Sequence, residues 1–91
     1  MKEAIKQYGA IIENVQKDID EAESFKADLM EEYKALNSLD DMIKIQSMVL
    51  KTTDYISQKR ISKVELERQK REYEEAYAKM QNECEAEYVQ D

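Results

Sequence analysis

The stretch "TTDYISQKRISKVELERQ", residues 52–69, decides the architecture of this chain, because it determines whether one long helix or two shorter ones make up its second half. The stretch contains no glycine or proline that would break a helix. It does contain Ser62 followed by Glu65, the spacing of a capping box at the start of a helix. The same spacing arises by chance in charged helices. The residues therefore favour a continuous or gently kinked helix and leave a turn near Ser62 open.

The residues before this stretch, 3–36, carry a heptad repeat. One position of the repeat holds Ile5, Ile12, Ile19 and Tyr33, with Lys26 as the single interruption. The other position holds Tyr8, Val15, Ala22, Leu29 and Leu36. Apolar residues at 3-4 spacing form the seam of a coiled coil or an antiparallel bundle. The repeat predicts a first helix over residues 3–36.

A short turn is predicted at residues 37–38. Asn37 is suited to the left-handed conformation that ends many helices. Ser38 is suited to capping the next helix, with Asp41 three residues further on. Because so short a connection makes neighbouring helices antiparallel, the second helix is expected to fold back along the first.

The second half of the chain is helical throughout on its sequence pattern. Residues 39–60 repeat apolar or small side chains at 3-4 spacing: Met42, Ile45, Val49, Thr52 and Ile56. Residues 63–88 carry a thinner apolar stripe of Leu66, Tyr73, Tyr77, Met80 and Cys84. Charges of alternating sign stand four residues apart at Lys63, Glu67, Arg71, Glu75, Lys79 and Glu83. Such neighbours form ion pairs along a helix.

These patterns predict a single all-α domain over residues 1–91, in one of two forms. An antiparallel helical hairpin, or coiled coil, results if the C-terminal helix is continuous. A three-helix bundle results if the chain breaks near Ser62 and forms helices over 39–60 and 63–88. In the hairpin, the last 15 or so residues lack a partner in the chain, and Tyr73, Tyr77, Met80 and Cys84 are expected to need another chain.

The composition argues against an enzyme. The chain has no histidine, the commonest general base and metal ligand, and a single glycine, too few for a phosphate-binding loop. Cys84 has acidic neighbours that would not activate a thiol, so a packing role is favoured. We expect no catalytic, metal-binding or cofactor-binding residues, and no cofactor.

The net charge of −7 disfavours binding to nucleic acids and to anionic membranes. The basic residues between Lys59 and Arg71 are spread around the helix, so they are interpreted as an ion-pair face. No apolar run is long enough to span a bilayer, and "MKEAIKQYGAII" has no signal-peptide core. With one cysteine, these features predict a cytoplasmic protein.

The leading functional hypothesis is a small acidic helical module, an adaptor or inhibitor, that binds a partner protein by helix packing and forms a homodimer. Methionine and tyrosine are enriched at adaptable interfaces. The predicted partner-binding residues are Met42, Ile45, Met48, Val49, Tyr73, Tyr77 and Met80.

Two alternatives remain open. The first is an acidic mimic of nucleic acid, as in phage-type inhibitors, which blocks a basic cleft of a nuclease or polymerase. The residues that it would use are Glu72, Glu74, Glu75, Glu83, Glu85 and Glu87. The second is a structural coiled-coil component of a larger assembly.

Overall fold

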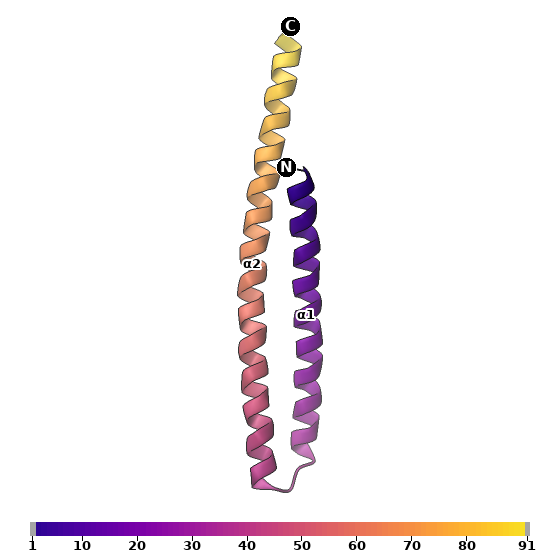
Figure 1. The fold of residues 1–91 in the computed structure, drawn as a ribbon, viewed down its shortest axis with the longest axis vertical. Helices are drawn as coiled ribbons and strands as arrows, with labels where there is room; N and C mark the ends of the chain where they lie inside the picture. The colour runs from indigo at the N-terminus through magenta and orange to yellow at the C-terminus, as the bar shows by residue number, and fades with distance from the viewer. Residues whose placement is uncertain (1, 91) are drawn as a thin grey trace.

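The computed structural model describes residues 2–90, and the side chains of residues 2–83. Over this range the chain forms two helices, α1 (Lys2–Lys34) and α2 (Leu39–Gln90). The helices lie side by side and antiparallel, and α2 continues past the start of α1 (Figure 1). The molecule measures 80 × 15 × 14 Å. The predicted antiparallel hairpin with a long C-terminal helix is thus confirmed.

Helix α2 runs without a break through Ser62, so the three-helix alternative does not form. The carboxylate of Glu65, which a capping box would need, instead accepts hydrogen bonds from the Arg68 side chain. The hydroxyls of Thr52 and Thr53 each donate 2.8 Å hydrogen bonds to carbonyls four residues earlier in the same helix. Because these polar groups are satisfied inside a helix, nothing in the stretch requires a turn.

The connection between the helices differs from the prediction. No residue of the described chain has a positive φ, so the expected left-handed conformation of Asn37 is wrong. Helix α1 instead tightens at its end, where the amides of Ala35 and Leu36 donate to carbonyls three residues earlier. The amide of Met42 bonds to the carbonyl of Ser38, which places Ser38 at the start of α2. Residues 36–38, which belong to neither helix, make the reversal without a positive φ.

The heptad positions form the contact of α1 with α2. The nine apolar residues of the repeat are buried or half-buried, and they include the buried Ile19 and Leu29. Lys26, the interruption, is half-buried as well. The heptad in the sequence therefore marks the seam between the two helices.

The seam of α2 changes character along its length. Near the turn it is apolar, and Ile56 is its buried centre. Beyond Ile56 the same 3-4 spacing places Lys59, Lys63 and Lys70 on the seam, each with about a third of its side chain exposed. The Lys63 ammonium donates a hydrogen bond to Gln16 across the seam. The half of the hairpin away from the turn is thus held by polar contacts as well as apolar ones.

Candidate interaction surface

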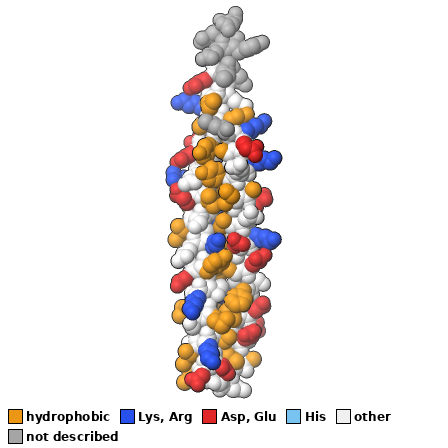
Figure 2. Space-filling view, in the orientation of Figure 1, with side chains coloured by type: hydrophobic (Ala, Val, Ile, Leu, Met, Phe, Trp, Pro, Cys, Tyr) orange, Lys and Arg blue, Asp and Glu red, His pale blue; other side chains and the backbone are white. Residues whose placement is uncertain are grey.

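The hairpin has a thin core and much exposed apolar surface. Only Ile19, Leu29 and Ile56 are buried among the described side chains. Large apolar side chains remain exposed at Ile11, Phe25, Met30, Leu39, Ile43, Met48, Leu50, Tyr55, Ile61, Val64, Tyr73 and Met80. Figure 2 shows hydrophobic side chains along much of the face in view, between rows of charged ones. Two helices can cover only one side of each other, so their remaining apolar faces stay in solvent.

The total solvent-accessible surface of the chain is large for its mass. The chain exposes 7273 Å². A compact monomer of the same mass would expose about 5,500 Å². The difference, roughly 1,700 Å², reflects the elongated shape and exceeds the roughly 800 Å² that each partner contributes to a standard protein interface.

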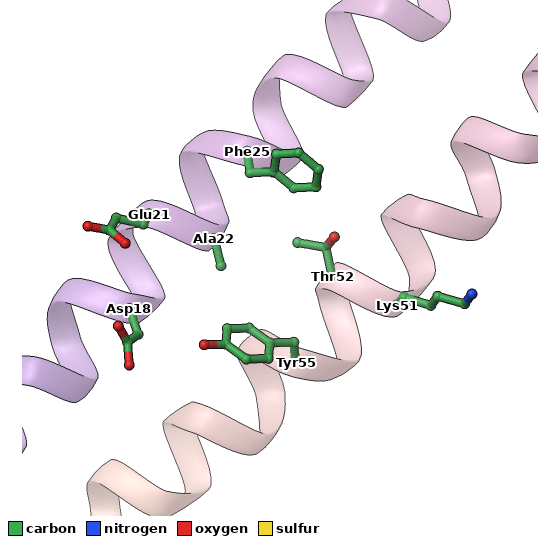
Figure 3. Close-up of a pocket in the computed structure, with 7 residues that line it drawn as sticks. All are labelled: Asp18, Glu21, Ala22, Phe25, Lys51, Thr52 and Tyr55. Atoms are coloured by element: carbon green, nitrogen blue, oxygen red, sulfur yellow. The ribbon is translucent and has the colours of Figure 1, made fainter.

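One set of exposed side chains, Ile11, Phe25, Met48 and Tyr55, forms what we call the aromatic flank. The two residues from each helix are multiples of seven apart, so each pair lies on one side of its helix. A groove of about 380 Å³ opens on this flank between α1 and α2. Phe25 and Tyr55 stand at either end of it, with Ala22 and Thr52 between them (Figure 3). The two small seam residues leave the hollow that the two aromatic rings border.

Charged side chains surround this groove. Asp18 and Glu21 lie on its α1 side, and Lys51 extends from α2 on the other side (Figure 3). Lys59 makes a 3.5 Å ion pair with Asp18, and its ammonium lies 5.4 Å from the centre of the Tyr55 ring. This cation–π contact orients the ring at the end of the groove.

A second set of exposed side chains, Met30, Leu39, Ile43, Leu50, Ile61 and Val64, forms what we call the aliphatic flank. Five of the six belong to α2. Leu50 and Met48 are only two residues apart, so the aliphatic and aromatic flanks lie on different faces of α2. Met30, Tyr33, Lys34, Gln46, Val49 and Leu50 line a groove of about 560 Å³ on this flank.

The structure distributes the predicted partner-binding residues of the first part of α2 between the seam and the surface. Met42, Ile45 and Val49 are half-buried, in 3-4 register with the buried Ile56, so they face α1. Met48 is 42% exposed on the aromatic flank. Of these four residues, Met48 is thus the one most open to a partner.

The predicted residues further along α2 lie near or beyond the start of α1. Tyr73 stacks at a tilt against Tyr8, with ring centres 5.4 Å apart, so it has a partner in its own chain. Tyr77 is half-buried and its hydroxyl accepts a 2.9 Å hydrogen bond from Gln81. Met80 is 50% exposed. The side chain of Cys84 lies outside the described residues.

The acidic residues of the mimicry hypothesis are partly neutralised. Glu72 pairs with Arg68, and Glu74 lies 3.6 Å from Lys70. Glu75 and Glu83 are exposed, whereas the side chains of Glu85 and Glu87 lie outside the described residues. Lys63 and Glu67, two neighbours in the predicted series of alternating charges, form an ion pair at 3.6 Å in the described part of the chain.

Arg68 forms the centre of a small charge cluster on the surface of α2. It bonds to Glu65 three residues before it and to Glu72 four residues after it. The hydrogen bond from Arg68 lowers the pKa of the Glu65 carboxyl below its ordinary value. The same bond raises the pKa of the Arg68 guanidinium. The cluster supports the helix through the stretch in which a turn was the alternative.

None of the six residues of the aliphatic flank was among the predicted interaction residues. A signal for five of them is present in the sequence. Leu39, Ile43, Leu50, Ile61 and Val64 make a second series of apolar positions on α2, offset from the seam. The series on the seam is more regular, so the prediction selected several residues that pack within the hairpin instead of the exposed ones.

Within the described residues, neither helix combines the length and the apolar character that crossing a membrane requires. In the same part of the chain, no three acidic or cysteine side chains gather into a group that would hold a metal ion. No protein-family model, no curated protein and no solved structure matches this chain. The surface therefore has to be interpreted from its own residues.

Proposed function

We propose that this protein is a non-enzymatic interaction module, an adaptor or inhibitor, that binds a partner protein by packing helices against its exposed flanks. The observation that supports the proposal is the contrast between three buried side chains and the apolar residues left exposed along both flanks. Exposed apolar surface of this extent is characteristic of proteins that associate with others.

The aromatic flank offers such a partner a groove bordered by two aromatic rings, and the groove on the aliphatic flank is larger but has a single aromatic residue, Tyr33, in its lining. Phe25 and Tyr55 supply large, rigid contact surfaces, and Ala22 and Thr52 give the groove its depth. Aromatic anchors around a small pocket are typical of the residues that dominate binding energy. An amphipathic helix laid into this groove would place one apolar side chain between the two rings.

Affinity enrichment from the source cells with quantitative mass spectrometry tests the proposal. The wild-type chain is compared with a Phe25→Ser/Tyr55→Ser variant, and with a control variant, Glu13→Ser/Arg71→Ser, that changes exposed residues outside both grooves and preserves the net charge. We expect a protein enriched by the wild type and the control, and lost with the groove variant. Equal enrichment by all three, or none above background, would contradict the proposal.

The two alternatives predict different solution behaviour. Mimicry of nucleic acid requires binding that weakens steeply as salt rises, whereas apolar helix packing changes little. The pairing of Glu72 and Glu74 with basic neighbours lowers the support for mimicry. A structural coiled-coil component would form oligomers larger than a dimer as its concentration rises.

A further inference from the structure

We propose that the aliphatic flank binds a second copy of this chain, with the two α2 helices antiparallel about a two-fold axis near residue 52. The inference rests on the proposed function, because it assigns one of the two flanks to self-association. The aromatic flank lies on a different face of α2 and remains open to another protein.

The spacing of the exposed residues makes this flank complementary to itself. Ile43 and Ile61 lie nine residues on either side of residue 52, and Leu39 and Val64 lie thirteen and twelve residues from it. In an antiparallel pair centred there, Ile43 of one copy meets Ile61 of the other, twice. A two-fold interface requires this correspondence: if residue i of the first copy contacts residue j of the second, then residue j of the first copy contacts residue i of the second.

The middle of the flank suits close approach of two helices. Ser57 lies between Leu50 and Val64, seven residues from each, and is exposed. In the proposed register it lies opposite Ser47 of the second copy. Leu50 lies two residues from the axis, so the Leu50 residues of the two copies come close to each other. The serines lie between this central pair and the larger aliphatic residues at both ends, which allows the facing surfaces to interdigitate.

Charge favours the same arrangement. Residues 39–64 hold five basic and three acidic residues, so they are the part of this acidic protein in which two copies repel each other least. The acids Asp40 and Asp41 stand at one end of the segment, and Lys59, Arg60 and Lys63 stand near the other. Lys59, Arg60 and Lys63 contact Asp18, Glu23 and Gln16 of α1. Antiparallel pairing therefore places the two acids at the same level along the helix as these bases without a direct charge contact, whereas parallel pairing would place the acids of both copies together.

The flank is long and exposed. The paired segment of 26 residues is about 39 Å long. The five α2 residues of the flank are each between 54% and 71% exposed, so they are free to be covered.

Sedimentation velocity over a dilution series tests the pairing. We expect the wild type to reach twice its chain mass of 10.8 kDa at micromolar concentration. Ile43→Glu and Ile61→Lys alone should each raise the dimer dissociation constant at least about tenfold, since each dimer carries the change twice. An equimolar mixture of the two variants should restore the dimer, because the carboxylate introduced at position 43 of one copy then faces the ammonium introduced at position 61 of the other.

Met80→Glu, an exposed change outside the flank, should leave the dimer unaffected.

Circular dichroism of each variant separates loss of pairing from loss of folding, and the helix content should stay at the wild-type value. A wild type that remains at 10.8 kDa up to about 100 μM would overturn the inference, as that concentration marks only weak affinity. A dimer that survives Ile61→Lys, or a mixture that fails to recover, would overturn the proposed register. Should a monomeric wild type still enrich a partner that depends on Phe25 and Tyr55, the self-pairing fails and the proposed function stands.

Discussion

Three lysines on the seam distinguish the two halves of this hairpin at the level of single residues. Lys59, Lys63 and Lys70 occupy positions where a coiled coil ordinarily carries apolar side chains. Lys59 and Lys63 reach Asp18 and Gln16 of α1, whereas Lys70 pairs with Glu74 of its own helix. A polar residue on a seam lowers stability and fixes register, so the alignment of α1 on α2 depends on the contacts of Lys59 and Lys63.

Replacing Lys63 by leucine should therefore stabilise the hairpin. The side chain is 30% exposed on the seam, so leucine would bury apolar surface where an ammonium now stays partly solvated, with a gain of roughly 1 kcal/mol. The substitution removes the ion pair with Glu67, which is partly exposed and contributes little, and the hydrogen bond to Gln16 across the seam. Urea unfolding at a fixed protein concentration measures the change.

Lys79→Leu is the matched control for that substitution, because Lys79 lies on the exposed side of the same helix. It should change the free energy of unfolding by less than about 0.5 kcal/mol. If Lys63→Leu stabilises no more than this control does, then Lys63 does not occupy the seam.

At the scale of the helices, the decisive feature is the absence of a break in α2. The sequence left that question open because Ser62 and Glu65 have capping-box spacing. In the structure α2 continues through residue 62, and the carboxylate of Glu65 accepts a hydrogen bond from Arg68. A spacing rule could not foresee this, since it depends on which of two groups the carboxylate reaches.

Two serines with the same chemistry should consequently respond in opposite ways to alanine. Ser62→Ala removes a residue of lower helix propensity from mid-helix and should raise the free energy of unfolding by a few tenths of a kcal/mol. Ser38→Ala removes the residue at the start of α2 and should lower it by about 1 kcal/mol. Thermal unfolding of both variants by circular dichroism gives the comparison. A loss of about 1 kcal/mol in Ser62→Ala would instead indicate a helix start at residue 62.

The sequence predicted the seam of the hairpin better than its surface. The heptad from Ile5 to Leu36 identified the half-buried face of α1 residue by residue, because burial imposes a period on the sequence. The exposed residues of the aliphatic flank follow a looser pattern, interrupted by Ser57. The contact between Tyr8 and Tyr73 was also missed, since it depends on the register of two long helices.

At the scale of the whole molecule, the hairpin is a rod 80 Å long and only about one helix pair wide, 15 × 14 Å. Such a shape gives each chain a large surface relative to its core, and among the side chains of residues 2–83 the core consists of three buried ones. The proposed association with other chains rests on that geometry and requires that α2 stays a single helix. A break in α2 would fold its second half back and cover one flank.

The most direct test of this account is a distance between two points on α2. Spin labels at Lys51→Cys and Glu75→Cys, in a Cys84→Ser background, report it by pulsed electron resonance. An excess of unlabelled protein removes distances between copies. A continuous helix places the two labelled backbones about 36 Å apart, 24 residues along one axis. A peak at about 10–20 Å, the spacing of two adjacent helices with their labels, would contradict the account, because the chain would then turn near Ser62.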